Sequence, residues 1–556
     1  MSDSASTSSP AFDPYEPRPT FVQRHAEALS AIAVFVLTVG LTVISFPPFK
    51  TPEFAYAMLV PGVYWAYTKP RRKLFIWTML AAQAVAWTIV LAWLHHVTWL
   101  GLLLLGPFVG AWVGSWFLAA AWTMPRMVGR PTLTRLTAML GLAAMWVLIE
   151  WTRTWLLTGF PWLPLSASQW TMVSMLQVAA YTGAYGISFV VVAVNLGFAA
   201  YAHRLFREGA TGLNKRSQEF FLALFLVLGC FSLHVADTFN RGSFARPLAR
   251  VAFVQPYIPQ EVKWDPARAD GILEILRDTT LRAAATNPDL ILWPEASTPF
   301  AVLGDDNMKA FVETLARRAR VPMLIGSVGF ETVGNEERWR NAAFLVTPDG
   351  GLQKDFYSKR HLVPFGEYVP LKPVLGWLRK VTPIGEDAVP GADSAPLVVS
   401  LRGGPEVFGP LICYEDIFPV LARRSVLAGA NVLTVATNNA WYGEGGAAHQ
   451  HAAHAVLRAV ENRRPVLRCG NGGWSGWIDE FGAVRATLTN EAGSIYFRGT
   501  RTLNITRDAR WIERNSVYTE YGDWFVLVCV LLAGVGAMAL AAMPPAAREP
   551  VVPLEA

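Results

Sequence analysis

One cysteine follows directly on an apolar run and precedes two carboxylates. The run 409–412 ends at Cys413, and Glu415 and Asp416 come just after it. A short apolar run that begins with Gly and Pro predicts a buried strand, so Cys413 should lie where side chains reach a cleft. A thiol attacks as the thiolate, and nearby carboxylates oppose its ionisation. A cation must therefore lie near Cys413 if it is a nucleophile; the alternative is a buried structural cysteine.

A carboxylate follows a second apolar run in the same way. Glu295 comes after the run 290–293 and directly after Pro294. Packing against Trp293 and Pro294 is expected to raise the pKa of the Glu295 carboxyl, which would let it act as a general base near neutral pH. The alternative is an exposed carboxylate that caps the following helix.

The candidate cation lies between these two positions in the chain. Lys359 stands in the stretch 357–367, and its charge could hold a thiolate and then a developing oxyanion. Glu367 lies on an expected turn, where it would anchor Lys359 or assist the base. The same stretch contains His361, so a solvated basic face and a Cys–His pair are the alternatives.

Residues beside the cysteine and after the next apolar run complete the predicted site. The backbone N–H of Tyr414 is a natural oxyanion donor, and Glu415 would support the nucleophile from behind. The stretch 437–443, TNNAWYG, ends the apolar run 432–436. Its amide and aromatic side chains, Asn438 among them, suit the wall of a pocket.

No metal site and no cofactor are expected. His449, His451 and His454 are metal ligands by type, but no carboxylate or cysteine joins them at tight spacing. Cys413 and Cys469 could instead form a disulfide if their side of the membrane is oxidising, and that bond would forbid thiolate chemistry.

The region from about 248 to 508 has the pattern of an α/β domain. Short apolar runs alternate there with helical stretches such as 267–284 and 306–320. It contains no GxxxxGK loop, no HExxH and no basic stripe, so no nucleic acid is expected as a partner. The apolar runs are 251–254, 290–293, 323–325, 343–346, 407–412 and 432–436.

The rest of the chain is predicted to lie in a membrane. Of its 556 residues 53% are hydrophobic and 16% are charged, against roughly 25% charged residues in soluble domains. A disordered tail is expected over the polar residues 1–24. Seven apolar segments within 25–240 and one within 520–545 then approach the roughly 20 residues that cross a bilayer. The segments lie near 28–46, 53–68, 74–94, 98–123, 136–152, 173–201, 219–236 and 523–543.

Pro61 and Gly62 predict that the second of these segments is tilted or irregular. The loops after the second, fourth and sixth segments are rich in Lys and Arg, and the alternate loops are poor in them. The positive-inside rule then places the N-terminus and the tail 546–556 in the cytoplasm and residues 248–508 on the periplasmic face. The basic residues are Lys69, Arg71, Arg72, Lys73, Arg126, Arg130, Arg135, Arg204, Arg207, Lys215 and Arg216.

These motifs resemble those of a known superfamily. Glu295, Lys359 and Cys413, in the settings WPE, YSK and ICYE, are similar to the Glu–Lys–Cys triad of the nitrilase superfamily, which implies an α-β-β-α sandwich. The stretches KRHLVPFGEYVP, LICYED and TNNAWYG, between seven upstream and one downstream apolar segments, more specifically resemble the apolipoprotein N-acyltransferase family. The resemblance covers nearly the whole chain, and the long polar N-terminus and the GEGGAA stretch after Tyr442 depart from it.

The resemblance implies a bacterial inner-membrane acyltransferase with a ping-pong mechanism. The Cys413 thiolate would take an acyl chain from a phospholipid. The N-terminal amine of a diacylglyceryl-cysteine apolipoprotein would then attack the thioester, in the last step of lipoprotein maturation. Glu295 would be the base and Lys359 would stabilise charge, in a monomer held in the lipid bilayer. Glu367, Tyr414 and Glu415 match further functional positions of the family. Trp264 and Trp441 match aromatic positions near its substrate entrance.

Physical chemistry favours a membrane site for such a reaction. Each CH2 group of an acyl chain costs about 0.8 kcal/mol to expose to water, so the cleft should lie at the membrane surface. One alternative is a membrane-tethered amidase with the same triad that acts on small amides. Another is a transporter, which predicts charges deep in the apolar segments. Glu150 and Arg153 lie near a segment end instead.

Overall fold

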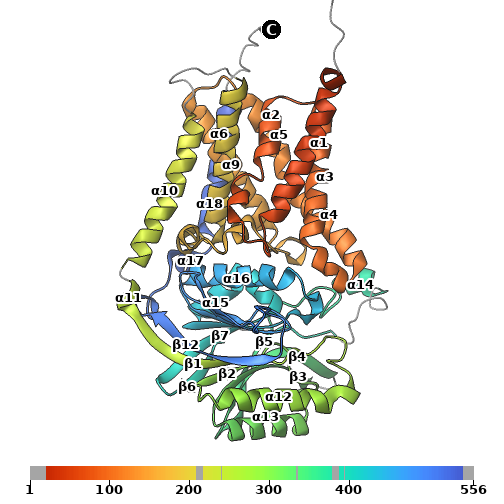
Figure 1. Cartoon of the computed structure of the whole chain (residues 1–556), viewed down its shortest axis with the longest axis vertical. Coiled ribbons are helices and arrows are strands. Elements are labelled where there is room, and N and C mark those ends of the chain that lie inside the picture. Colours follow the sequence, from red (N-terminus) through yellow and green to blue (C-terminus); the bar gives the residue numbers. More distant parts are fainter. Residues whose placement is uncertain are drawn as a thin grey trace, which may run out of the picture.

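The protein consists of a group of apolar helices and, joined to one end of it, two stacked β-sheets with helices outside them (Figure 1). The computed structural model describes residues 21–542 except 208–216, 240, 334–335, 378–386 and 393–394. Most of the predicted tail 1–24, all of the tail 546–556, and the predicted loop residues Lys215 and Arg216 lie outside the described residues.

Each of the two sheets has six strands, in the orders β12-β1-β2-β3-β4-β5 and β11-β10-β9-β8-β7-β6. In each sheet three successive strands are parallel, β1 to β3 in the first and β7 to β9 in the second, and the other pairs are antiparallel. The strands are β1 (Ala245–Gln255), β2 (Leu290–Leu292), β3 (Met323–Val333), β4 (Glu336–Thr347), β5 (Gly351–Ser358), β6 (Leu397–Leu401), β7 (Gly404–Ile412), β8 (Val432–Asn438), β9 (Val466–Asn471), β10 (Gly476–Ile478), β11 (Val484–Thr487) and β12 (Gly499–Asp508).

Alternate side chains of the central strands serve two different cores, as the period of two in a strand requires. Val251 and Phe253 of β1 pack with Ile412 of β7 between the two sheets. Their neighbours Ala252 and Val254 pack against the helices outside the first sheet. Helices α12 and α13 cover the first sheet, and α15 and α16 cover the second (Figure 1). Their bounds are α12 (Ala269–Ala284), α13 (Asp306–Ala319), α15 (Pro419–Leu427) and α16 (Ala447–Asn462).

The predicted α-β-β-α sandwich is thereby confirmed. Each of the predicted apolar runs contains a strand or lies within one, and the predicted helical stretches 267–284 and 306–320 are α12 and α13. Edge strand β12 was not predicted, because its residues mix polar and apolar types and most of them are only partly buried.

Within the described chain, seven helical spans are long and apolar enough to cross a bilayer. Six precede the sandwich and one follows it. The helices are α1 (Phe21–Ile44), α3 (Arg72–Val90), α4 (Trp99–Gly114) continued by α5 (Trp116–Met127), α6 (Thr132–Thr152), α9 (Ala184–Arg207), α10 (Gln218–Thr238) and α18 (Trp524–Ala541).

The predicted segment 53–68 is irregular. It forms the 3-10 helix η1 (Pro52–Tyr56) and then the eight-residue α2 (Val60–Tyr67). At 1.5 Å per residue α2 is about 12 Å long, well short of the bilayer core. The predicted segment 173–201 likewise begins with two single turns, α7 (Val173–Leu176) and α8 (Ala179–Thr182), before α9.

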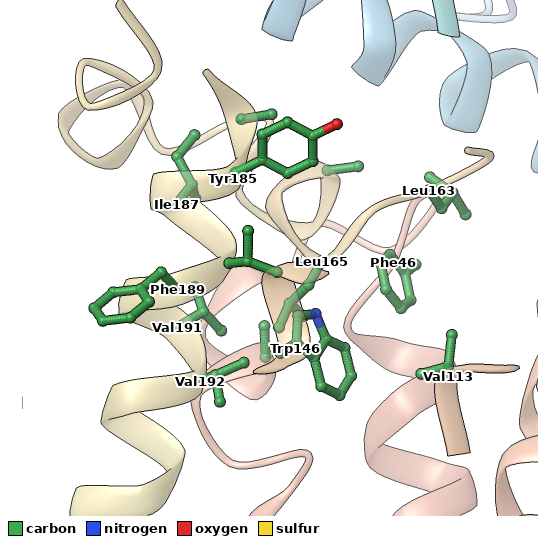
Figure 2. Packing of buried hydrophobic residues seen from close by; sticks show 14 of the residues in the cluster. Phe46, Val113, Trp146, Leu163, Leu165, Tyr185, Ile187, Phe189, Val191 and Val192 are labelled. Atoms are coloured by element: carbon green, nitrogen blue, oxygen red, sulfur yellow. The ribbon is translucent and has the colours of Figure 1, made fainter. Parts of the chain in front are cut away.

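Helix α9 lies at the centre of these helices and α10 at their edge. In the apolar stretch of α9, 89% of the residues are buried, whereas in that of α10 only 17% are buried. Figure 2 shows side chains of α9 packed beside Trp146 of α6 and Leu165. The exposed face of α10 is apolar and suits contact with lipid; its large side chains are Phe221, Leu224, Phe225, Leu228, Phe231 and Val235.

Helices α6 and α18 approach each other through glycines. A Cβ atom added at Gly141 of α6 would lie 3.1 Å from the Cα of Gly536 of α18, and one added at Gly536 would lie 2.8 Å from the carbonyl oxygen of Thr137. Small residues permit such close backbone contact between helices in a membrane. The last helix therefore packs directly against the backbone of α6.

Helix α16 joins the sandwich to the apolar helices through a buried amide. The Gln450 side chain accepts hydrogen bonds from the indole N–H groups of Trp93 and Trp162, each at 2.9 Å. Its NH2 group donates to the carbonyl oxygens of Pro47 at 3.1 Å and Val90 at 2.9 Å. One side chain thus holds three connections between helices against the sandwich.

The basic connections lie at the opposite end of the helices from the sandwich (Figure 1). Helix α3 begins at Arg72 and runs down to the turn that contains Trp93, which contacts Gln450. Helix α9 begins at Ala184, whose N–H donates to Glu461 of α16 at 3.0 Å, and runs away from it to Arg207.

Candidate active site

The ends of β2, β5 and β7 bring the three predicted catalytic side chains together. Glu295 follows β2, Lys359 follows β5 directly, and Cys413 follows β7 directly. The Nζ atom of Lys359 lies 3.4 Å from Oε1 of Glu295. Cys413 lies beside the Glu295 carboxylate and helps to lower the pKa of that carboxyl. An acid, an amine and a sulfur from distant parts of the chain therefore share one buried place.

Lys359 is shared by two carboxylates. Its Nζ lies 3.0 Å from Oε1 of Glu367, and its side chain is 1% exposed. Asn341 of β4 bridges the same carboxylates, since its Nδ2 donates to Glu295 at 2.8 Å and to Glu367 at 2.9 Å. Burial opposes the charge of Lys359, but Glu367 and Glu295 outweigh it and raise the pKa of Lys359 above its ordinary value. The alternative of a solvated basic face is therefore wrong for Lys359, and Glu367 anchors Lys359.

The predicted raised pKa of Glu295 is wrong. Burial pushes this pKa upward, but the charges of Lys359 and Lys263 and the hydrogen bond from Asn341 bring it below its ordinary value. The backbone N–H of Asn438 donates to the second carboxylate oxygen at 2.9 Å. Charged neighbours therefore override the apolar ones, and Glu295 is a buried, ionised carboxylate.

Cys413 is a protonated thiol on a strained turn. Its backbone φ of 50° lies in the left-handed region, which residues other than glycine rarely adopt. Burial and the charge of Glu295 raise the pKa of the Cys413 thiol to about 12, although Lys359 and a hydrogen bond from Thr437 oppose the shift. The Thr437 hydroxyl lies 3.4 Å from the sulfur. A base must therefore take the thiol proton for the sulfur to attack.

Glu415 lies buried behind the nucleophile. Its carboxylate accepts hydrogen bonds, each at 2.7 Å, from the N–H of Ile412, the hydroxyl of Tyr357 and the N–H of Arg360. These partners come from the ends of β7 and β5. Glu415 thereby fixes the spacing between the strands that carry the sulfur and the amine.

A second charged cluster lies on the α16 side of the cysteine. The Nε2 atom of His451 lies 2.8 Å from Oδ1 of Asp416 and 3.1 Å from the carbonyl oxygen of Cys413. Arg468 of β9 pairs with the other oxygen of Asp416, and all three side chains are fully buried. The cluster holds the backbone of Cys413 in place.

The alternatives from the sequence do not fit the structure. Cys413 and Cys469 are both free thiols, and the sulfur of Cys469 lies 3.4 Å from the carbonyl oxygen of Val254. The ring of His361 packs on Phe418, with 3.9 Å between ring centres, and burial lowers its pKa to about 4. Within the described residues, no group of three or more His, Cys, Asp and Glu side chains is placed to hold a metal ion.

The predicted substrate-binding residues lie in the loop 256–265 and at the end of β8 with the turn that follows it. We call these two segments the rim of the site. Asn438 donates from its side chain to Gln260 at 2.7 Å and so joins the loop 256–265 to the turn after β8. Trp264 on the first loop is 48% exposed, and Trp441 on the second is partly exposed.

Aromatic contacts join this rim to the membrane helices. The ring of Tyr442, next to Trp441, lies 4.5 Å from that of Trp93, measured between ring centres. The hydroxyl of Tyr414 donates to the carbonyl oxygen of Gly159 at 3.0 Å. The rim therefore lies at the base of the helices.

Three residues of the site, Arg468, Asn341 and Lys263, were not predicted from the sequence. Arg468 stands in the apolar run 465–469, and a lone charge in a buried strand requires a partner, so this signal was available. Asn341 and Lys263 gave no such signal, because each lies in a mixed polar stretch.

Family comparisons match two parts of the chain. Residues 39–197 match the apolipoprotein N-acyltransferase N-terminal domain, and residues 250–500 match the carbon-nitrogen hydrolase domain. Among solved structures, an amidase from Nesterenkonia sp. AN1 is 19% identical, and the alignment covers 48% of this chain and 97% of that one with a TM-score of 0.35.

Similar proteins extend over nearly the full length. A Geobacter metallireducens protein is 32% identical over 519 residues, which cover 90% of this chain and 93% of that protein. A Methylococcus capsulatus protein is 32% identical over 426 residues, which cover 75% of this chain and 76% of that protein. Both are named apolipoprotein N-acyltransferase. This chain belongs to the apolipoprotein N-acyltransferase family.

Proposed function

We propose that this protein transfers an acyl chain from a membrane phospholipid to the N-terminal amine of a diacylglyceryl-cysteine lipoprotein. The observation that carries the proposal is the meeting of Glu295, Lys359 and Cys413 beside Tyr414, whose hydroxyl donates to the carbonyl oxygen of Gly159 in the membrane part of the chain. The relatives named apolipoprotein N-acyltransferase support lipoprotein N-acylation as the reaction.

In the first stage the sulfur of Cys413 attacks the ester carbonyl carbon of the phospholipid while Glu295 takes the thiol proton. Attack and proton transfer occur together, because the thiol is protonated at rest and Glu295 is ionised. Lys359 and the backbone N–H of Tyr414 stabilise the oxyanion. The bond from carbon to the glycerol oxygen then breaks, and Glu295 returns its proton to that oxygen. A lysophospholipid leaves and a thioester remains.

In the second stage the neutral amine of the lipoprotein attacks the thioester carbonyl carbon. Glu295 takes a proton from that amine, and the oxyanion is stabilised as before. The C–S bond breaks, an amide is released, and the sulfur of Cys413 receives the proton from Glu295.

The position of the site suits lipid substrates. Each CH2 group drawn into water costs about 0.8 kcal/mol, and the contact between Tyr442 and Trp93 keeps the turn after β8 against the apolar helices, from which an acyl chain would come. Basic residues such as Arg72 and Arg207 mark the other end of the helices, and the positive-inside rule assigns that end to the cytoplasm. The protein then works as a monomer in the bacterial inner membrane with its sandwich on the periplasmic face.

A membrane-tethered amidase is the second candidate, because residues 250–500 match the carbon-nitrogen hydrolase domain. The same three side chains would then cleave small amides. That activity predicts ammonia release and no use of phospholipid.

The acyl-enzyme is the decisive species. The full-length protein in detergent is incubated with phospholipid and its intact mass is measured. We expect one acyl chain on Cys413, which hydroxylamine removes and which a diacylglyceryl-cysteine peptide converts to an N-acyl peptide. Cys469→Ala, which changes a second buried free thiol, should keep the adduct, and Cys413→Ala should lose it. A Cys413→Ser variant that N-acylates at the normal rate would contradict the mechanism.

A further inference from the structure

A second buried amine lies beside the three side chains of the site. Lys263 stands on the loop 256–265 and its side chain is 1% exposed. Its Nζ donates to the backbone carbonyl oxygen of Glu295 at 3.2 Å and lies 5.6 Å from the ring centre of its neighbour Trp264. The steps derived above do not use this amine.

The electrostatic partners of Lys263 are the reacting groups themselves. The Glu295 carboxylate and Cys413 both favour its charged form, against a burial effect that lowers the pKa of Lys263 to about 8. In turn Lys263 lowers the pKa of Glu295. Lys359, the Thr437 hydroxyl and the backbone N–H of Asn438 also favour the thiolate, and the hydroxyl of Tyr442 interacts with the sulfur as well.

The carbonyl that Lys263 holds belongs to a tightly constrained turn. Ala296, the next residue, has a φ of 44°, in the left-handed region. On the other side the backbone of Glu295 packs on Gly326, where an added Cβ would lie 2.8 Å from the Glu295 Cα. A buried ammonium on this carbonyl stabilises the turn and so the direction of the Glu295 side chain.

We propose that Lys263 is a positioning residue for acyl transfer. Its ammonium fixes the turn that presents Glu295, and its charge favours both the ionised Glu295 and the Cys413 thiolate. Lys359 faces the two carboxylates of Glu295 and Glu367, so these three groups carry one net negative charge, which the ammonium of Lys263 balances. Lys263 also links Trp264 to the base, since Trp264 is the next residue of the same loop and Lys263 donates to the carbonyl oxygen of Glu295. The proposal rests on the proposed function in taking Cys413 as the nucleophile.

The test measures alkylation of Cys413 by iodoacetamide across pH in the full-length protein, resolved by peptide mass spectrometry. Lys263→Met removes the charge and keeps the side-chain length. Its Cys413 should react about tenfold more slowly at neutral pH, the effect of roughly one unit in proton affinity. The acid limb of its profile should move to higher pH, because Glu295 loses a cation that favours ionisation. Lys263→Arg keeps the charge and should restore the profile.

Lys309→Met, which changes an exposed lysine on α13, is the control and should match the wild type. Thermal unfolding of each variant separates a loss of folded protein from a change in profile, because misfolding lowers the amplitude and leaves the limb in place. An unchanged limb in folded Lys263→Met would overturn the proposal. A shifted limb in a protein that takes no acyl chain from phospholipid would support it and contradict the proposed function instead.

Discussion

Cys413 lies between two buried charged clusters, one formed by Lys359 with Glu295 and Glu367 and one by Asp416 with His451 and Arg468. The first acts on the sulfur through the charge of the Glu295 carboxylate, which raises the pKa of the thiol. The second touches the carbonyl oxygen of the same residue through His451. Both are almost fully buried, so burial alone does not distinguish them.

The clusters differ in the atoms that they control. In the first, a carboxylate accepts the thiol proton and an ammonium faces the developing charge. In the second, each oxygen of Asp416 is already paired, by His451 and by Arg468, and neither pair reaches the sulfur. The comparison indicates that one cluster moves protons and the other holds the backbone. Variants on each side should therefore fail in different ways.

The largest effect is expected on the proton-transfer side. Glu295→Gln keeps the size of the side chain but removes the base, and we expect acyl-enzyme formation to slow by about 10²- to 10⁴-fold with little change in stability. Single-turnover mass spectrometry measures the rate. Glu274→Gln, on the exposed face of α12, should behave as the wild type. A folded Glu295→Gln at the normal rate would assign the base elsewhere.

For the cluster next to α16 we expect a large loss of stability and a smaller loss of activity. Asp416→Asn leaves Arg468 buried without its charge partner, which costs about 3–5 kcal/mol of stability. Thermal unfolding in detergent should show this loss, and activity per folded molecule should fall less than for Glu295→Gln. The double variant Asp416→Asn, Arg468→Met removes the stranded charge and should regain much of the stability. A double variant no more stable than the single one would contradict the pairing.

The same carboxylate predicts a dependence of stability on pH. Burial opposes ionisation, but His451 and Arg468 lower the pKa of Asp416 from 3.8 to about 2. Because the folded pKa is the lower one, the stabilisation is complete above about pH 3.8 and is lost as the pH falls toward 2. The difference in melting temperature between wild type and Asp416→Asn should therefore shrink from pH 5 to pH 2.5. A constant difference would contradict this.

A smaller effect is expected where α16 meets the helices. Gln450→Ala leaves the buried N–H groups of Trp93 and Trp162 without their acceptor, at a cost of about 1–3 kcal/mol. Gln450→Glu keeps the acceptor for both indoles but loses the donor to the carbonyls of Pro47 and Val90. The melting temperature of the wild type should be higher than that of both variants. An unchanged melting temperature for Gln450→Ala would mean that these hydrogen bonds do not stabilise the protein.

The smallest effect is expected at the exposed rim. Trp264→Ala removes an aromatic surface beside the cleft, and we expect the apparent KM for phospholipid to rise about fivefold, the effect of roughly 1 kcal/mol, with kcat preserved. Trp264→Phe should retain most of the affinity. A loss of kcat at constant KM would mean that Trp264 acts on the reaction itself.

The sequence was informative where an apolar run ends in a polar residue. Glu295, Lys359 and Cys413 each follow such a run, and strands that end at one edge of a sandwich bring their following residues together. The pKa of Glu295 was not predictable in this way. Local neighbours Trp293 and Pro294 suggested an upward shift, but Lys263 and Lys359 reverse it from 32 and 64 residues away in the chain.

The membrane part shows the same limit. Its long helices follow from composition, since about 20 apolar residues can hardly adopt another structure in lipid. The division of 53–68 into η1 and α2 depends on a neighbour instead. Asn195 of α9 accepts from the N–H of Leu59 at 2.8 Å and donates to the carbonyl oxygen of Ala55 at 2.8 Å, satisfying backbone groups that a continuous helix would pair internally.

The face of α6 that packs against α18 lacks this partner during most of the protein's synthesis. Helix α18 begins at Trp524, after the last strand of the sandwich has been translated, and α6 ends at Thr152. At about 5–20 residues per second the ribosome needs tens of seconds to make the intervening chain. While the sandwich folds, six spans already lie before it, and the chain enters the sandwich from α10, the last of them. The arrival of α18 then closes the helical part around α6 and gives the domain its second anchor.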